Sequence, residues 1–263
     1  MKIAILAASG SLYFPFFIDK PKSLYHINGE IQLEKVIKNA LQIVNEEDII
    51  IVAGYKYEYM ESFLRKYPKI KLKINENYKK PAIYSFYKAI EDENEDIIFI
   101  MADESISISN IKRVAESKKE MALLTHDDFY YYSLGIFKLS KNQFYQFNQD
   151  YLEWDYIKKI YCFANNKEKF DGHFNINSGI CIGYIIIDLV RKIGKIESIE
   201  NPKDSKNAYI DFFHYNPKLE YVPDIDKFED TDEYKNSIFL KIYHTIFCKP
   251  IIIFRLVLQR IFK

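Results

Sequence analysis

The sequence lacks an excess of charge, a cysteine framework and a histidine motif. Its 37 Lys and Arg residues balance 37 Asp and Glu, and because nucleic-acid binding normally requires a basic excess, we expect no nucleic-acid partner. The three cysteines are far apart and form no CxxC pair, which argues against a disulfide framework or zinc site and indicates a reducing, cytoplasmic compartment. The five histidines show no HxxxH or HxH spacing, so structural or surface roles are favoured over metal ligation.

Long hydrophobic runs are missing at both ends of the chain. The N-terminal MKIAILAAS is too short for a signal peptide and reads as a first buried strand. The tail is aromatic, aliphatic and basic, but charges interrupt it too often for it to span a bilayer. It fits a helix packed on its own domain, a helix docked on the partner of a homodimer, or a peripheral helix at the inner face of the membrane. We expect a main domain at 1–235 and a basic, hydrophobic helical tail at 236–263.

Short apolar runs alternate with amphipathic helices through the first hundred residues. This rhythm is typical of βαβ units and a parallel sheet, and 48% apolar and 28% charged residues indicate a globular chain. Strands are expected at 1–8, 48–53, 70–74 and 96–101, with helices at 33–44, 58–67 and 81–90. After Asp103 the rhythm weakens, with strands expected at 122–125, 130–139 and 177–187, a mixed, helix-favouring stretch at 143–161 and a helix from Phe228.

Candidate site residues follow two of these strands. In open parallel sheets, ligands bind outside the carboxyl ends of the strands. The first strand ends in the small residues Ala7 to Ser11, which let a ligand approach the backbone closely. The fourth ends at Asp103, which fits either a functional carboxylate or an ordinary helix cap. Lys20 and Lys22 flank Pro21 and are able to neutralise phosphate oxygens, although, taken alone, they are better explained as a solvated charge run.

The order of these features resembles a known enzyme family. The chain reads Leu6-Ala7-Ala8-Ser9-Gly10, then Pro21-Lys22-Ser23-Leu24, then Ile27-Asn28-Gly29, a strand followed by Gly54-Tyr55, and a strand followed by Asp103. Farther on stand Asn177-Ser178-Gly179-Ile180 and Asp226, with Asp224 as the less favoured alternative to Asp226. This set resembles the sugar-phosphate and alcohol-phosphate nucleotidyltransferases. The resemblance covers residues 1–110 well and 170–235 loosely.

The resemblance implies a fold and a reaction. The fold is α/β: a Rossmann-like mixed, mainly parallel sheet with flanking helices, of the glycosyltransferase-A-like kind. The reaction is Mg²⁺-dependent transfer of a nucleoside monophosphate from a nucleoside triphosphate to a small phosphorylated acceptor, for use in polysaccharide biosynthesis. By resemblance, Lys22 and Asp103 are catalytic, Asp103 and Asp226 bind the metal, and the nucleotide is bound by Leu6, Ala7, Ala8, Ser9, Gly10 and Ser85.

The preferred nucleotide is CTP. Asn75-x-Asn77 followed by Ile83-Tyr84-Ser85 most resembles the phosphocholine cytidylyltransferase branch, although Pro81-Ala82 stands where that branch has asparagines. Trp154, beside two carboxylates, is a candidate wall of an acceptor pocket for a quaternary ammonium group, but packing explains a lone tryptophan more simply.

One departure from the family keeps a non-catalytic alternative open. No arginine stands between Gly10 and Lys22, where the family places one against the triphosphate, so Lys20 is the candidate substitute. A non-catalytic relative that binds a nucleotide or partner is therefore an alternative. A glycosyltransferase of the same fold is less favoured, because Asp103-Glu104-Ser105 is not the DxD motif that such an enzyme carries.

Overall fold

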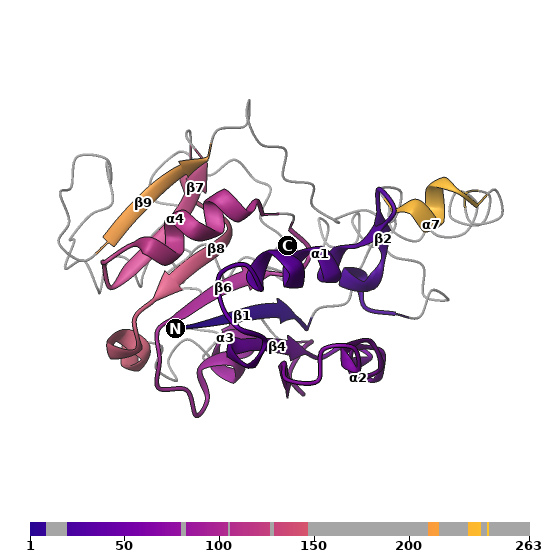
Figure 1. The fold of residues 1–263 in the computed structure, drawn as a ribbon, viewed down its shortest axis with the longest axis horizontal. Coiled ribbons are helices and arrows are strands. Elements are labelled where there is room, and N and C mark those ends of the chain that lie inside the picture. The colour runs from indigo at the N-terminus through magenta and orange to yellow at the C-terminus, as the bar shows by residue number, and fades with distance from the viewer. Residues whose placement is uncertain are drawn as a thin grey trace, which may run out of the picture.

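A computed structural model describes most of the first 146 residues and short parts of the rest. The described residues are 1–8, 20–79, 83–104, 106–126, 129–146, 210–215, 231–237 and 241. Within them the chain forms one large sheet with helices packed on its two faces (Figure 1).

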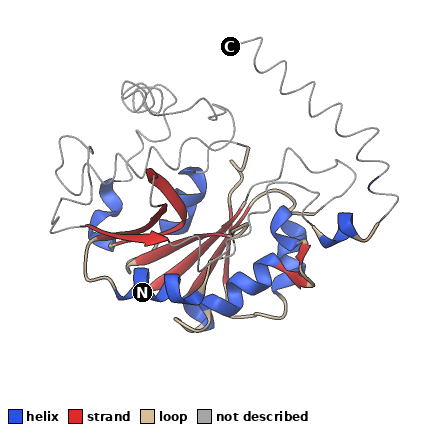
Figure 2. Cartoon of the chain, turned by 90° about the horizontal axis from the view of Figure 1, so that it is seen from above, coloured by secondary structure: helices blue, strands red, loops and turns tan. Residues whose placement is uncertain are grey.

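The sheet has seven strands in the order β5-β4-β1-β6-β8-β7-β9. Four are parallel neighbours: β5 (Lys71–Ile74), β4 (Ile49–Ala53), β1 (Lys2–Ala7) and β6 (Ile97–Met101). The other three are β8 (Phe129–Leu139), antiparallel to β6, β7 (Met121–His126), antiparallel to β8, and β9 (Ile210–Tyr215), parallel to β7. Viewed from above, these strands fan out as a twisted sheet (Figure 2).

The helices follow the strands they cover. The longer ones are α1 (Gln32–Ala40), α2 (Tyr57–Leu64), α3 (Ile83–Ile90) and α4 (Ile108–Glu116). Short elements are the 3-10 turns Lys22–Leu24, Glu46–Asp48 and Lys141–Gln146, the small hairpin of β2 (His26–Ile27) and β3 (Glu30–Ile31), and α7 (Asp232–Lys235). In the part of the chain that is described, no helix is long and apolar enough to cross a membrane.

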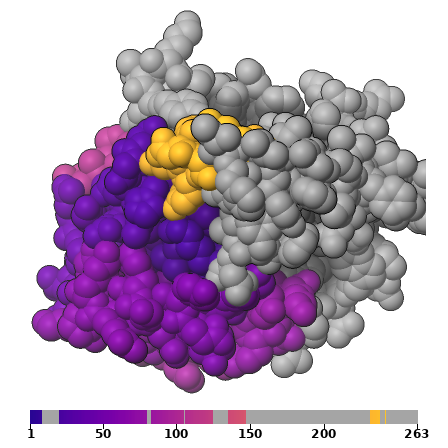
Figure 3. All heavy atoms as spheres, turned by 90° about the vertical axis from the view of Figure 1, so that its right-hand side faces the viewer, coloured from indigo at the N-terminus to yellow at the C-terminus, as the bar shows by residue number. Residues whose placement is uncertain are grey.

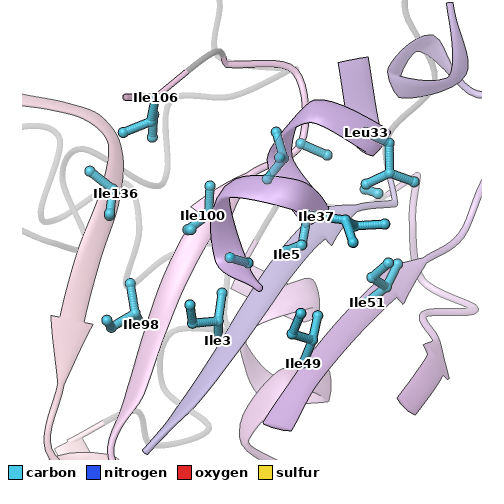
Figure 4. Packing of buried hydrophobic residues seen from close by; sticks show 14 of the residues in the cluster. Ile3, Ile5, Leu33, Ile37, Ile49, Ile51, Ile98, Ile100, Ile106 and Ile136 are labelled. Carbon is cyan, nitrogen blue, oxygen red and sulfur yellow. The ribbon is translucent and has the colours of Figure 1, made fainter. Parts of the chain in front are cut away.

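The central strands are apolar throughout because both of their faces are covered. On one face, β1, β4 and β6 pack against α1, α2 and α4. On the other, the ring of Phe86 of α3 lies 5.1 Å from that of Phe99 and 5.2 Å from that of Phe137, and the last two stack at 4.6 Å. Figure 4 shows the first layer, in which the labelled residues are Ile3, Ile5, Leu33, Ile37, Ile49, Ile51, Ile98, Ile100, Ile106 and Ile136.

The expected alternation of strands and helices is confirmed through β6, with ends that differ by one to a few residues. The strands expected at 122–125 and 130–139 are also present, as β7 and β8. The helix expected from Phe228 begins at Asp232 and is short. The start of the 143–161 stretch is a 3-10 turn ending at Gln146; its remainder, the strand expected at 177–187 and nearly all of the tail lie outside the described residues, so the domain boundary stays a prediction.

Candidate nucleotide-binding site

The carboxyl ends of the parallel strands meet at one edge, and main-chain hydrogen bonds join them just beyond the sheet. Ala102 N donates to Leu6 O at 3.1 Å, and Tyr55 N donates to Ala8 O at 2.8 Å. Asn75 N donates to Ala53 O at 2.7 Å. The residues that follow β1, β4, β5 and β6 are therefore fixed relative to one another. Figure 3 faces this edge and shows a hollow beside α7, with the indigo, N-terminal part of the chain at its floor.

Lys22 and Asp103, the two predicted catalytic residues, form an ion pair at this edge. Lys22 begins a 3-10 turn after Pro21, and Asp103 lies in the turn after β6. Their side chains are 15% and 20% exposed, so the pair is mostly covered but reachable from solvent. A cation approaching Asp103 and an anion approaching Lys22 would each find a partner of opposite charge already in place.

Asp103 and Glu104 are neighbours whose carboxylates have different surroundings. The Glu104 side chain lies against Gly135 of β8, where a Cβ would come within 2.7 Å of Glu104 Oε1. Gly135 also has a φ of +59°, which favours glycine. The first carboxylate of this turn therefore pairs with Lys22, whereas the second packs on β8. Sequence reasoning considered Glu104 only as part of a failed DxD motif and missed the role of Gly135.

Ser85 lies in the first turn of α3 beneath the loop after β5. Its Oγ accepts a hydrogen bond from Asn75 Nδ2 at 2.9 Å, and Asn75 Oδ1 accepts one from Asn77 N at 2.9 Å. Asn75 and Ser85 are both buried. The structure thus joins the asparagine segment to Ser85, which supports the loop after β5; binding of the nucleotide by Ser85 stays a prediction.

Gly54 brings three strand ends into close contact. A Cβ at this position would lie 2.8 Å from Ala8 O and would overlap the Cβ of Tyr78. The rings of Tyr55 and Tyr78 lie 6.0 Å apart. A side chain at position 54 would therefore force Ala8 or Tyr78 away, which explains the glycine after β4.

Lys20, the candidate substitute for the family's arginine, is bound by a carboxylate. Its Nζ lies 2.9 Å from Glu233 Oε1 of α7 and 4.3 Å from the centre of the Tyr25 ring. Glu233 also binds His26, whose Nδ1 lies 2.9 Å from the same oxygen. Burial raises the pKa of Glu233, but its hydrogen bonds with His26 and Lys20 outweigh burial and hold that pKa below its ordinary value.

Of the two predicted metal ligands, Asp103 is the one that lies among the described residues. Mg²⁺ takes hard oxygen ligands and is held by one or two carboxylates together with substrate phosphates, so a partly exposed Asp103 carboxylate fits such an ion. Among the residues that the structure describes, no group of three or more His, Cys, Asp or Glu side chains is arranged to hold a metal. Asp226, the predicted second ligand, lies outside them, as do Asp224, Ser9, Gly10, Trp154 and Asn177–Ile180.

The fold and this strand-end edge define the class of nucleotide-diphospho-sugar transferase folds. The chain resembles the inositol-1-phosphate CTP transferase from T. maritima with a TM-score of 0.55 and 15% identity, over 89% of this chain and 93% of the other. It also resembles 4-diphosphocytidyl-2C-methyl-D-erythritol synthase from Anaerococcus prevotii DSM 20548, with a TM-score of 0.51 and 13% identity, over 90% and 98% of the two chains. These comparisons confirm the predicted fold.

The chain belongs to the family described as Domain of unknown function (DUF6564), whose model matches residues 20–178. It is also similar to CTP:phosphoglutamine cytidylyltransferase of Campylobacter jejuni subsp. jejuni serotype O:2 (strain ATCC 700819 / NCTC 11168), with 26% identity over 132 residues. That match covers 47% of this chain and 52% of the relative, so the chain spans about half the length of the curated relative.

Proposed function

We propose that this protein transfers CMP from CTP to a phosphorylated alcohol or a sugar 1-phosphate and releases pyrophosphate. The observation that carries the proposal is the Lys22–Asp103 ion pair at the carboxyl ends of β1 and β6. It joins a cation suited to phosphate with a carboxylate suited to a metal, at the edge where folds of this kind bind ligands. Use of the product in polysaccharide biosynthesis stays a prediction.

The proposed reaction needs charge stabilisation more than proton transfer. An acceptor phosphate oxygen forms a bond to the α-phosphorus, the bond from that phosphorus to the bridging oxygen breaks, and pyrophosphate leaves with the electron pair. Because the acceptor phosphate is already anionic, the step requires no general base. Lys22 would offset the negative charge that gathers around the α-phosphoryl group. Mg²⁺, held by Asp103 and by the predicted ligand Asp226, would neutralise phosphate charge when bound.

CTP is the preferred nucleotide for two reasons. The Asn75–Asn77 turn and Ser85, the residues that resemble the cytidylyltransferase motif, form one hydrogen-bonded unit next to the strand ends. The curated relative is named for CTP, and the two structural neighbours described above are named for a CTP transferase and a diphosphocytidyl product. The relative's acceptor is a phosphorylated compound, which supports the same class of acceptor here.

Pyrophosphate release tests the proposal. The full chain is incubated with Mg²⁺ and CTP, UTP, GTP or ATP, each against a panel of phosphorylated alcohols and sugar 1-phosphates. We expect release with CTP and one class of acceptor. Absence of release and of triphosphate binding in a well-folded protein would overturn the proposal in favour of a non-catalytic relative. A second incubation replaces the triphosphates with nucleotide sugars, and release of free nucleoside diphosphate there, with no pyrophosphate in the first, would instead indicate a glycosyltransferase.

A further inference from the structure

Glu233 binds both ends of the segment that carries Lys22. One oxygen, Oε1, lies 2.9 Å from Lys20 Nζ and 2.9 Å from His26 Nδ1. The main-chain amide of His26 also donates to Oε1 and Oε2, each at 3.2 Å. Lys22 lies between Lys20 and His26 in the sequence, so the Glu233 carboxylate holds both ends of segment 20–26. We call this set of contacts the clasp.

Asp232, the preceding residue of α7, holds the adjoining turn. Asn28 N donates to Asp232 Oδ1 at 3.1 Å, and Gly29 N donates to Oδ2 at 2.5 Å. Both turn residues have positive φ, at 55° for Asn28 and 83° for Gly29. A left-handed conformation is unfavourable for asparagine relative to the helical and extended regions, and hydrogen bonds from the turn amides to a carboxylate offset that cost.

Helix α7 is itself anchored, so its carboxylates are not merely mobile surface groups. Thr231 is fully buried, and its Oγ1 accepts a hydrogen bond from Tyr234 N at 3.3 Å. Glu233 is 24% exposed and Lys20 is 27% exposed, which places their ion pair in a partly covered site. Figure 3 shows α7 lying directly on the indigo segment at the rim of the hollow.

We propose that Glu233 is a positioning residue for the transfer reaction. Its carboxylate fixes segment 20–26 so that Lys22 faces Asp103 at the strand ends. The inference rests on the proposed function. It assigns Lys20 to structure: the ammonium ties its segment to α7 and does not replace the family's arginine on the triphosphate. A shift of about 1 Å in a group that contacts the reacting atoms lowers a rate by about a hundredfold, so a loosened segment would lower catalysis without removing any catalytic group.

Two substitutions and one control separate this role from direct phosphate binding. Glu233→Gln keeps the shape of the side chain but removes its charge, and Lys20→Gln removes the other half of the ion pair. Glu30→Gln, in the β2–β3 hairpin, serves as the control because it breaks an exposed 2.7 Å ion pair with Lys38 of α1. Circular dichroism and thermal melting are recorded for each variant to establish that it folds.

Hydrogen exchange measures the clasp without any reaction. We expect peptides covering 24–31 to exchange about tenfold faster in Glu233→Gln than in the wild type, because the amide of His26 loses its charged acceptor. Glu30→Gln should leave that exchange unchanged. Wild-type exchange at 24–31 in Glu233→Gln would overturn the inference, whatever the activity of the protein.

Steady-state pyrophosphate release measures the consequence for catalysis. We expect both Glu233→Gln and Lys20→Gln to lower kcat by roughly ten- to a hundredfold, with KM for the triphosphate within about threefold of the wild type. If Lys20 binds triphosphate directly, Glu233→Gln would free it and equal or exceed wild-type activity, while Lys20→Gln would mainly raise KM; either result overturns the inference. A folded wild type that neither releases pyrophosphate nor binds a triphosphate refutes the proposed function, whereas the exchange experiment still decides whether Glu233 holds segment 20–26.

Discussion

The two edges of the parallel sheet both carry lysine–carboxylate clusters, but the clusters differ in how completely they are enclosed. At the amino end, the 1% exposed Glu93 binds Lys2, Lys71 and Lys73 at 2.5, 2.7 and 2.9 Å. At the carboxyl end, the side chains of the Lys22–Asp103 pair are 15% and 20% exposed. The first cluster has one carboxylate surrounded by cations, whereas both side chains of the second are partly exposed to solvent.

This difference separates a structural ion cluster from a candidate functional one. Burial raises the pKa of Glu93, but hydrogen bonds from its three lysines outweigh burial and lower that pKa from 4.5 to about 2. Lys73 also donates to the main-chain oxygens of Ala89 and Glu91, so the cluster ties β5 to the end of α3. A carboxylate so fully bound has no room for an exchanging ligand. The account therefore predicts stability effects at one edge and activity effects at the other.

Replacing Lys22, at the carboxyl edge of the sheet, should cause the largest loss of activity. We expect Lys22→Gln to lower kcat/KM for pyrophosphate release by a hundred- to a thousandfold, the range typical for losing one group that stabilises developing charge, or about 3 to 4 kcal/mol. The melting temperature should stay close to that of the wild type. A variant that keeps more than half of the wild-type kcat/KM would contradict the role of Lys22.

Replacing Glu93 should have the opposite profile. We expect Glu93→Gln to lower the free energy of unfolding by about 3 kcal/mol, because it leaves three lysines near a neutral side chain in a covered site. Pyrophosphate release per folded molecule should stay at the wild-type level. Urea unfolding measures the first quantity, and Glu95→Gln, which alters the exposed neighbour paired with the N-terminus, is the matched control. Unchanged stability in Glu93→Gln would refute the structural assignment.

The contribution of the Glu93 cluster to stability should also depend on pH in the wild-type protein. The folded-state pKa of Glu93 lies below its ordinary value, so its contribution is fully present above pH 4.5 and is lost as pH falls toward 2. Lowering one pKa from 4.5 to about 2 corresponds to roughly 3 kcal/mol of stability at neutral pH. Burial lowers the pKa of Lys73, which works against this gain at the same site. Urea unfolding between pH 6 and pH 3 should show a shallower loss for Glu93→Gln than for the wild type; parallel losses would count against the prediction.

A methyl group at position 54 should lower both the stability of the fold and the affinity for the triphosphate. Gly54→Ala places a Cβ against Ala8 and Tyr78, so we expect it to lower stability by about 1 to 3 kcal/mol through overpacking. Because the displaced residues lie at the proposed nucleotide edge, triphosphate affinity should fall as well. Calorimetric titration with CTP checks affinity, and a variant that binds as tightly as the wild type would show that this contact does not shape the nucleotide site.

The parts of the fold that the sequence predicted are those with strong local patterns. The continuous apolar run of β1 and the helical spacing of Leu33, Val36 and Ile37 each determine an element within a few residues. Helix α4 was missed, although Ser107 caps it by accepting from Asn110 N at 3.3 Å, because the rhythm of strands and helices weakens after Asp103. Strand β9 and the β2–β3 hairpin were also missed; their short segments pair within the sheet or with each other and carry little local signal.

The residues of the candidate site also include some that the sequence predicted and some that it did not. Lys22 and Asp103 were predicted because each follows a strand of the parallel sheet and because their order resembles a known family. Glu233 was not, because its contact with Lys20 joins residues 213 positions apart and no local pattern marks either of them. Long-range pairs of this kind depend on the tertiary fold, and the clasp is visible only in the structure.

The most direct test of the account is the rate of pyrophosphate release by Asp103→Asn relative to the wild type, with Mg²⁺, CTP and the acceptor that the panel identifies. Asparagine keeps the size of the side chain but removes the charge that pairs with Lys22 and would hold the metal. The account predicts a fall in kcat of about a thousandfold with the fold intact by circular dichroism. Wild-type release by a folded Asp103→Asn protein would contradict the assignment of this edge as the active site.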